Sequence, residues 1–485
     1  MTQFDKRNLS MMMDFYEMTM SYGYFHQCHG DVRVAFDLFF RSVPDKGGYA
    51  VFAGLEHVIE FVENLSFSEA DIDYFRAQNL FSEEFLSFLR DFRFRGDIYA
   101  VPEGTIIYPN EPLMTIVAPI IDAQLIETAI LAQINHQSLI ATKASRIVRA
   151  AEGRKVSDFG ARRAHNMDAA TYGARAAYIG GVDMTATVSA GQQFGIPISG
   201  TMAHSWVMFF EDEFTAFKKY AELYPQATVL LVDTYDVIHS GIPNAIRTAH
   251  EVLAPQGHRL AGVRIDSGDL AYLSKRIRTM LDDAGLADCK IILSNSLDEF
   301  TISSLLLQGA QVDSFGVGER LITAKSDPVF GAVYKLVAVE KDGVFAPRIK
   351  MSENVEKLTN PGIKDLYRIY DRHGKAVADM LALQGEEIDL TKPFRYVDPR
   401  KPWKNRFFEG FSAVNLRRLY VRSGKRVEQL PTLEEIRCYV QKQLAEEIWP
   451  EEQRFENPHR HYLDMTPMYY EVKMGLLDDM RGKHS

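Results

Sequence analysis

The runs TVLLVD (228–233), AGVRID (261–266) and KIILSN (290–295) decide the fold, because each is a short apolar segment followed by a longer stretch with helical spacing. The same rhythm extends over four more runs: KVSDF (155–159), DMTAT (183–187), ISGTMA (198–203) and VDSFGVG (312–318). Strands that alternate with helices in this way build βα units around a parallel sheet. The pattern does not separate an open sheet from a closed barrel, and the number of strands favours a barrel or partial barrel.

Polar residues cluster where these predicted strands end. The clusters are Asp158–Phe159–Gly160 with Arg162 and Arg163, Gly200–Thr201 with His204, Asp233–Thr234, Arg264 to Asp269, Ser294–Asn295–Ser296, and Gly316–Val317–Gly318. In a βα barrel the carboxyl ends of the strands form one rim, and that rim binds ligands. Helix N-capping explains any single cluster. Six clusters that include arginines and a histidine indicate a ligand site at the rim.

The flanking segments have a different pattern. VRVAFDLF (32–39) and VYKLVAV (333–339) predict strands, the Pro- and Gly-rich segment 96–119 predicts short strands and turns, and residues 122–151 predict a long apolar helix. We therefore expect an α/β fold with an irregular TIM-like barrel over 131–334. A second α+β domain is expected from residues 1–130 and 335–425, followed by a helical C-terminal extension over 426–485.

Composition narrows the class of protein. The 485 residues carry a net charge of −10, with 46% hydrophobic and 25% charged residues, which excludes collagen-like, disordered and disulfide-scaffold proteins. The acidic balance argues against non-specific nucleic-acid binding. The apolar runs are too short to span a bilayer, and the first residues do not resemble a signal peptide. The three cysteines form no CxxC pair, so we expect a cytoplasmic protein.

Two of the clusters carry specific chemistry. His204 in GTMAHSW lacks metal-ligand partners at a recognisable spacing, so it is an acid/base group, a nucleophile or a structural histidine. In RIDSGD, Arg264 suits a carboxylate or phosphate, and Asp266 and Asp269 suit ribose hydroxyls or Mg²⁺. The alternative for RIDSGD is a buried ion pair with a helix cap.

Two further clusters suit an anion. Gly316 and Gly318 allow close backbone approach to a phosphate before a helix, although a tight turn explains them equally well. Arg162 and Arg163 fit an anion site or a solvated surface pair.

A family resemblance is carried by stretches in a fixed order. They are MMDFYEMTMSYGYF (12–25), EGTIIYPNEPLMTI (103–116), ATKASRI (141–147), DFGARRAH (158–165), GTMAHSW (200–206), RIDSGD (264–269), SNSLDE (294–299), GVGERLITAKSDPVFGAVYKL (316–336) and KLTNPGIK (357–364). In these stretches the chain resembles the nicotinate phosphoribosyltransferase family over most of its length. Phe15 and Glu17 stand where the family more usually has Leu and Gln.

The resemblance implies a reaction and its partners. The family makes nicotinate mononucleotide and pyrophosphate from nicotinate and 5-phosphoribosyl 1-pyrophosphate. It couples this step of NAD salvage to ATP hydrolysis through a phosphohistidine, so its members are classed as ligases. The resemblance therefore implies ATP as co-substrate, Mg²⁺ as cofactor with unknown ligands, and a homodimer. It implies no nucleic-acid or membrane partner.

The same resemblance implies roles for individual residues. His204 would be the phosphorylated histidine, with Asp266 as a second catalytic residue. Nicotinate would contact four residues, namely Tyr16, Phe159, Thr201 and Arg264. The phosphoribosyl group and its phosphates would contact five, namely Arg162, Gly268, Gly316, Gly318 and Thr359.

Four rival hypotheses remain. A sibling enzyme would use nicotinamide, although the cationic Arg264 suits a carboxylate better. An enzyme of the quinolinate branch would be a much shorter chain. A barrel isomerase or aldolase would need a Schiff-base lysine or paired carboxylates, and no predicted strand end offers a clear lysine. A non-catalytic scaffold would lack the catalytic groups, whereas His204, Arg264 and Asp266 are all present.

Overall fold

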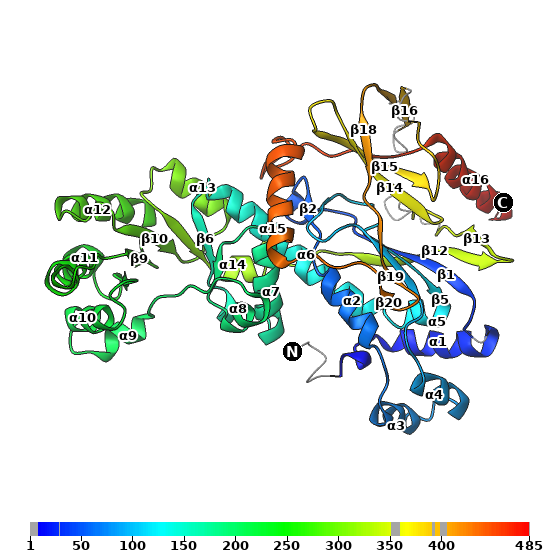
Figure 1. Cartoon of the computed structure of the whole chain (residues 1–485), viewed down its shortest axis with the longest axis horizontal. Coiled ribbons are helices and arrows are strands. Elements are labelled where there is room, and N and C mark those ends of the chain that lie inside the picture. The colour runs from blue at the N-terminus through cyan, green and yellow to red at the C-terminus, as the bar shows by residue number, and fades with distance from the viewer. Residues whose placement is uncertain (1–7, 29, 351–358, 390–392, 398–404, 485) are drawn as a thin grey trace. The chain divides into compact units, whose positions relative to one another are not determined.

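The computed structural model describes residues 8–28, 30–350, 359–389, 393–397 and 405–484. The chain divides into two units, shown in Figure 1. Unit 1 combines residues 1–139 with 329–485, and unit 2 is the continuous segment 140–328. Unit 1 is therefore built from both ends of the chain.

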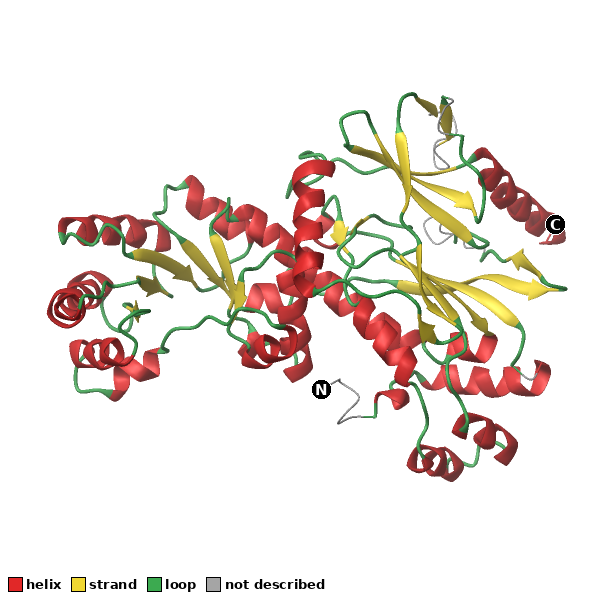
Figure 2. Ribbon diagram, viewed as in Figure 1, coloured by secondary structure: helices red, strands yellow, loops and turns green. Residues whose placement is uncertain are grey.

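Unit 2 contains a parallel sheet of six strands in the order β7-β6-β11-β10-β9-β8. The strands are β6 (Lys155–Asp158), β7 (Met184–Thr185), β8 (Val229–Leu231), β9 (Gly262–Ile265), β10 (Lys290–Ser294) and β11 (Ser314–Val317). Six of the seven strands predicted for this region are therefore confirmed, and they alternate with helices (Figure 2).

The seventh predicted strand, 198–203, is wrong. It contributes one isolated bridge, between Ile198 and Thr185. Ile198 is 62% exposed, and the carbonyl of Met202 accepts a hydrogen bond from the Arg264 side chain instead of from a neighbouring strand. Across the fully described residues 140–328, β7 and β8 are not paired with each other, so the sheet has two edges. The parallel α/β architecture is confirmed, but closure into a barrel is not.

Helices surround this sheet in Figure 2. They are α7 (Met167–Ile179), α8 (Val188–Phe194), α9 (His204–Phe209), α10 (Glu213–Leu223), α11 (Ile242–Thr248), α12 (Leu270–Asp283), α13 (Glu299–Leu307) and α14 (Glu319–Ile322). Short helical turns are η4 (Ala161–Arg163), η5 (Val237–Gly241), η6 (Ala249–Leu253) and η7 (Ala254–Gln256). Side-chain caps begin four of the longer helices, at Asn166, Asp212, Asp269 and Asp298. N-capping is thus part of what the strand-end polar residues do.

Unit 1 contains two larger sheets. The first has the order β13-β12-β1-β5-β3-β19-β20, and the second has the order β17-β16-β21-β15-β14-β18. The strands of the first are β1 (Arg33–Phe39), β3 (Asp97–Ala100), β5 (Met114–Pro119), β12 (Val333–Lys341), β13 (Val344–Pro347), β19 (Arg418–Arg422) and β20 (Lys425–Arg426). Those of the second are β14 (Lys364–Tyr370), β15 (Ala376–Leu383), β16 (Phe394–Val397), β17 (Asn405–Phe408), β18 (Ser412–Asn415) and β21 (Leu463–Met465). A small pair is formed by β2 (Ala50–Val51) and β4 (Ile106–Ile107).

The pairing of β12 with β1 joins the two ends of unit 1. Strand β1 lies between β5 and β12 and is antiparallel to both. Ala35, Val117, Val337 and Ala338, contributed by these three strands, form one buried apolar cluster. Strand β12 therefore shares a sheet with β3 and β5 of the early β-rich segment, with β1 between them.

The helices of unit 1 lie at its two chain ends. They are α1 (Phe15–Cys28), α2 (Leu55–Asn64), α3 (Glu69–Ala77), α4 (Glu83–Arg90), α5 (Ile120–Gln124), the first half of α6 (Glu127–Ala150), α15 (Leu433–Lys442) and α16 (Pro467–His484), with short turns η2 (Leu9–Met11), η3 (Pro44–Lys46) and η9 (Gln443–Glu447). A capping box at Ser68 and Asp71 begins α3, and the helical C-terminal tail is confirmed. No described helix combines the length and apolarity required to cross a membrane.

A buried charge cluster holds unit 1 together. Arg368 on β14 forms a bidentate ion pair with Asp379 on β15, with N–O distances of 2.9 and 2.7 Å. The His461 ring stacks on Tyr108 at 3.8 Å and contacts Glu452 at 3.1 Å through Nδ1. The cluster thus ties together residues that are up to 353 positions apart in the chain.

Candidate active site

The carboxyl ends of five adjacent strands of unit 2 carry the predicted site. In the order β6, β11, β10, β9 and β8, the strands run parallel, so their carboxyl ends lie along one edge of the sheet. The residues at this edge are Asp158 to Arg163 after β6, Gly316 to Gly318 at β11, Ser294 to Ser296 at β10, Arg264 to Asp269 at β9 and Asp233 after β8. Residues far apart in the sequence are thereby brought together.

An aromatic ring and a guanidinium group form one wall of this edge. The Cζ of Arg264 lies 5.7 Å from the centroid of the Phe159 ring. A Cβ atom added to Gly316 would lie 2.4 Å from Cε2 of that ring, so the ring occupies the space that a side chain at 316 would fill. The backbone N–H of Phe159 donates to the Val317 carbonyl at 2.8 Å and holds the turn against β11.

Only some of the N–H donors of the Arg264 guanidinium form hydrogen bonds within the described part of the protein. Its Nη2 donates to the Met202 carbonyl at 3.0 Å, while its Nε is buried and has no hydrogen-bond partner among the described residues. Burial lowers the pKa of Arg264, and the nearby Arg162 acts in the same direction, whereas Asp266 and Asp233 oppose the shift. A buried donor beside an aromatic face suits a flat ring that carries a carboxylate.

His204 is paired with a buried carboxylate. Its Nε2 lies 3.1 Å from Oδ1 of Asp233, and the histidine side chain is 40% exposed whereas that of Asp233 is 1% exposed. The other oxygen of Asp233 accepts hydrogen bonds from the Asp266 backbone N–H at 2.8 Å and the Ser267 hydroxyl at 2.6 Å. Asp233 therefore fixes the imidazole and the loop after β9 together. Asp233 ends the apolar run 228–233, but that pattern alone gives it no role at the site.

The two acids of RIDSGD have different surroundings. Oδ1 of Asp266 accepts a hydrogen bond from the Ser294 hydroxyl at 2.5 Å, which joins β9 to β10 at the edge. Asp269 caps α12 by accepting from the Tyr272 N–H at 3.0 Å. Between them, Gly268 has a φ of +81°, a backbone conformation that favours glycine. Asp266 therefore remains the better candidate for contact with a ligand.

Asp158 supports the turn that carries Phe159. Its carboxylate is fully buried and accepts from the Gly160 N–H and the Thr185 hydroxyl, each at 2.8 Å. Burial raises the pKa of Asp158, and these two hydrogen bonds oppose the shift.

The remaining predicted residues are distributed over both units. Thr201 is half-buried, and Arg162 is exposed in η4. Gly318 directly precedes α14. Tyr16 in α1 and Thr359 belong to unit 1 and are described apart from this edge. Tyr16 is 43% exposed, and the hydroxyl of the buried Thr359 accepts from the Lys350 N–H at 3.3 Å.

No metal-binding cluster accompanies these residues. Across the part of the chain that the structure describes, no group of three His, Cys, Asp or Glu side chains is placed to hold a metal ion. The edge nevertheless offers carboxylate oxygens at Asp233 and Asp266, which are ligands of the kind that Mg²⁺ accepts.

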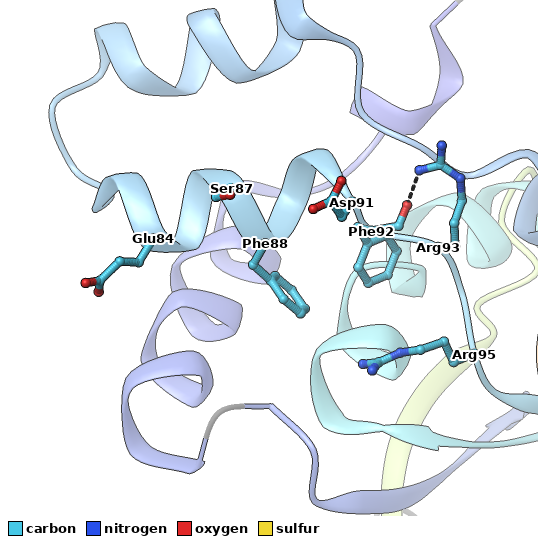
Figure 3. Close-up of a pocket in the computed structure, with 7 residues that line it drawn as sticks. All are labelled: Glu84, Ser87, Phe88, Asp91, Phe92, Arg93 and Arg95. Atoms are coloured by element: carbon cyan, nitrogen blue, oxygen red, sulfur yellow. Dashed lines mark hydrogen bonds between the residues drawn. The ribbon is translucent and has the colours of Figure 1, made fainter.

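A separate cavity of about 450 Å³ lies in unit 1, lined by residues 84–95 of α4 and the following segment (Figure 3). Phe88 and Phe92 line it together with two arginines. Arg93 donates to the Phe92 carbonyl at 2.5 Å, and Arg95 forms an ion pair with the buried Asp122 at 2.8 Å. Both guanidinium groups thus make contacts within the protein, and none of the predicted site residues lines this cavity.

Comparison with known proteins places the chain in a family. Residues 11–135 match the nicotinate phosphoribosyltransferase (NAPRTase) N-terminal domain, residues 154–359 match the NAPRTase family, and residues 363–473 match the C-terminal domain. The chain is 44% identical over 483 residues to the nicotinate phosphoribosyltransferase of Bacillus subtilis, an alignment that covers 99% of this chain and 97% of that relative.

More distant relatives agree. The nicotinate phosphoribosyltransferase of Caenorhabditis elegans is 34% identical, with 95% of this chain and 92% of the relative covered. The crystal structure of human nicotinic acid phosphoribosyltransferase superposes with a TM-score of 0.85 at 28% identity, covering 96% of this chain and 100% of that one. The order of the matching segments, the identity over nearly the whole length and the shared fold lead to one conclusion: the chain belongs to the nicotinate phosphoribosyltransferase family.

Proposed function

We propose that the protein forms nicotinate mononucleotide and pyrophosphate from nicotinate and 5-phosphoribosyl 1-pyrophosphate, and that it couples this reaction to ATP hydrolysis through a phosphohistidine. The reaction is a step of NAD salvage. Family membership supports the substrates. The observation that carries the proposal is the buried, unpartnered Nε of Arg264 beside the Phe159 ring, because this pair matches an aromatic acid.

The pyridine ring is assigned to the wall formed by Phe159 and Arg264. The aromatic side chain stacks on the flat ring, and the guanidinium binds its carboxylate. Thr201 lies next to Met202, whose carbonyl orients Arg264, so it is assigned to the same subsite. Tyr16 is assigned to the second face of the ring.

The phosphoribosyl group is assigned to the adjacent strand ends. Cleavage of the bond to pyrophosphate develops positive charge on the ribose and negative charge on the leaving group, so the site requires oxygen ligands for the sugar and donors for the phosphates. Asp266 is assigned to the ribose, and backbone N–H groups at Gly268, Gly316 and Gly318 to phosphate oxygens. Arg162 and Thr359 are assigned to the donor's phosphates.

His204 is assigned to ATP coupling. A neutral imidazole that donates its Nε2–H to Asp233 keeps a lone pair on Nδ1. That nitrogen attacks the γ-phosphorus of ATP, the bond to the ADP oxygen breaks, and ADP leaves. The phosphohistidine then adds negative charge close to Asp266 and the loop after β9, which is our hypothesis for how ATP raises substrate affinity.

Mg²⁺ is proposed as the cofactor. When bound, it neutralises pyrophosphate charge. The carboxylate oxygens of Asp233 and Asp266 suit such an ion. We further propose a cytoplasmic homodimer, which size-exclusion chromatography with light scattering and fractionation of the source cells can test.

One experiment tests the reaction and its coupling. The protein is incubated with nicotinate, 5-phosphoribosyl 1-pyrophosphate, Mg²⁺ and ATP, and the products are analysed for nicotinate mononucleotide and an acid-labile phosphoprotein. His204→Ala is expected to retain basal transfer but lose the phosphoprotein and the stimulation by ATP, and Asp233→Asn is expected to reduce both. Unchanged ATP stimulation in His204→Ala would refute the phosphohistidine assignment.

Competition between the two pyridines tests the substrate. Arg264 is expected to favour nicotinate over nicotinamide, because only nicotinate carries a carboxylate. A clear preference for nicotinamide would overturn the choice of substrate.

A further inference from the structure

Glu17 is a buried carboxylate next to a proposed substrate contact. It is the third residue of α1 and directly follows Tyr16. Its side chain is fully buried, whereas Tyr16 is 43% exposed. Oε1 of Glu17 reaches back to the Asp14 N–H at 3.4 Å, and the Glu17 N–H donates to the Asp14 carbonyl at 3.0 Å. The side chain therefore caps the start of its own helix.

The same oxygen also caps a second helix. Oε1 of Glu17 accepts from the Thr128 N–H at 2.9 Å and from the Thr128 hydroxyl. Thr128 is the second residue of α6, at the end where backbone N–H groups lack partners within the helix. Tyr16 lies near Glu127, the first residue of α6, and the negative charge of Glu127 adds to burial in raising the pKa of Tyr16. Glu17 therefore fastens the start of α1 to the start of α6, a contact that we call the α1–α6 joint.

The second carboxylate oxygen of Glu17 accepts no comparable hydrogen bonds. Oε2 is buried and has no hydrogen-bond partner among the described residues. Burial raises the pKa of Glu17 to about 7, although the hydrogen bonds from Thr128 and Asp14 oppose the shift. The ionisable groups that face it are Asp14 and Tyr16 on α1, Glu127 on α6 and Tyr334 on β12. Each of these groups is an acid, so ionisation of Glu17 adds negative charge beside Glu127. Lys335 on β12, next to Tyr334, is a cation that interacts with Glu127.

We propose that Glu17 is a positioning residue whose protonated form holds the α1–α6 joint closed and so fixes Tyr16 for the pyridine ring. This rests on the proposed function for the role of Tyr16, but not for the joint itself. Tyr16 contacts the substrate, and Glu17 acts through it.

The direction of the pH effect follows from proton linkage. In the closed joint Glu17 has a pKa of about 7, and in an open joint its carboxyl reaches water and regains a value near 4.5. The closed form therefore binds more protons between these two values, and rising pH favours opening. The ratio of open to closed forms is expected to increase by ~80-fold from pH 4.5 to 7 and to approach a constant value above pH 8.

Hydrogen exchange tests the joint without any assay of activity. In the full-length protein, the protection factor of the Thr128 amide is measured from pH 5 to 8, after correction for intrinsic exchange. It is expected to fall by ~40-fold from pH 5 to pH 7 and to level off near pH 8, because opening exposes this amide. Glu17→Gln keeps an acceptor oxygen and is neutral at every pH, so its protection factor is expected to stay constant. A pH-independent wild-type protection factor, or a Glu17→Gln variant that follows the wild type, would overturn the proposal.

The chain provides a matched control. Glu435 occupies the same third position in α15 and closes a capping box with Thr432, but it is exposed at the surface. Glu435→Gln is expected to follow the wild-type profile at Thr128. If Glu17→Gln does not fold, carbon-13 titration of the Glu17 carboxyl in the wild-type protein decides the matter: an inflection near pH 7 supports the proposal, and one near pH 4.5 refutes it.

Kinetics test the positioning of Tyr16. The quantity to measure is the ratio of the wild-type KM for nicotinate to the KM of Glu17→Gln at each pH. Ionisation of the substrates affects both values equally, so it does not change this ratio. This ratio is expected to rise between pH 5 and 7 while the corresponding kcat ratio changes less. A constant KM ratio, together with pH-dependent exchange at Thr128, would show that the joint does not position Tyr16. A failure to form nicotinate mononucleotide at any pH would instead refute the proposed function and leave the exchange result standing.

Discussion

At the scale of single residues, Gly316 illustrates how an absent side chain shapes the site. The Phe159 ring fills the space beside it, and a Cβ at this position would lie 2.4 Å from the ring. Gly316→Ala is expected to displace the ring, to raise the KM for nicotinate about 10-fold or more and to destabilise the fold by about 1–3 kcal/mol. Steady-state kinetics and urea denaturation measure the two effects.

Gly475 provides the control for that substitution. It lies within α16, and a Cβ there would meet no atom within 4 Å. Gly475→Ala is expected to leave the KM unchanged and to stabilise the helix by up to about 1 kcal/mol. An unchanged KM in Gly316→Ala would show that the Phe159 ring does not form the pyridine wall.

The sequence predicts the candidate site residues that end or follow apolar runs, but it does not predict which side chains they contact. Arg264, His204 and Phe159 were identified because each follows or ends an apolar run. Asp233 also follows such a run, but its link to His204 depends on a distance of 3.1 Å between residues 29 positions apart. No local pattern encodes that distance. The functional roles themselves stay predictions.

At the scale of elements, a buried ion cluster fixes helix α13 to α6. Lys143 Nζ lies 2.9 Å from Oε2 of Glu299, and Arg146 Nε lies 2.8 Å from Oε1. Glu299 begins α13, just after Asn295 and Ser296, which both have positive φ. Positive φ costs non-glycine residues energy, so the surrounding contacts must hold this turn at the edge of the sheet.

Glu299→Gln is expected to destabilise the protein by about 3–5 kcal/mol, because it leaves buried cations with a neutral partner. Urea denaturation measures the loss. Glu251→Gln is the control: Glu251 pairs with Arg247 at 3.0 Å, but both side chains are more than half exposed. That variant is expected to lose less than about 1 kcal/mol. Equal losses in the two variants would contradict a structural role for the buried cluster.

Secondary structure followed the sequence wherever local periodicity and burial agreed. Most residues of the six strands of unit 2 are buried, and a capping box forms at Ser68. The run 198–203 failed because Ile198 and Ala203 are exposed and Met202 uses its carbonyl to orient Arg264. The sequence also does not predict whether the sheet closes into a barrel. Closure requires β7 and β8 to pair with each other, and the composition of these strands does not determine that pairing.

At the scale of the whole molecule, the net charge of −10 proved a poor guide to ligands. The proposed anion contacts are local, at Arg264 and Arg162. Other charged residues, such as those of the buried cluster in unit 1, contribute to the stability of the fold. In the buried cluster of unit 1, burial by itself would lower the pKa of His461, but Asp379 and Glu452 outweigh it and raise that pKa.

The cluster predicts a pH-dependent stability. Because the folded-state pKa of His461 lies above its usual value of 6.5, the contribution of the charged ring is complete below about pH 6.5 and is lost as pH rises through the folded-state pKa. Urea denaturation between pH 6 and 9 is expected to show this decline. His461→Gln is expected to abolish it and to cost about 3–5 kcal/mol near pH 6. The exposed His250→Gln should retain the decline, and a flat wild-type profile would contradict the assignment.

The pairing of β1 with β12 also sets an order of events during synthesis. Unit 2 is one continuous segment and is complete once residue 328 has left the ribosome. At that moment β1 has β5 on one side, but its other partner, β12 at Val333–Lys341, has not yet emerged. The growing chain therefore exposes an apolar strand edge while its downstream neighbour is already folded. Unpaired edges of this kind recruit other chains, so the protein is exposed to aggregation from the synthesis of β5 until β12 has emerged and paired with β1.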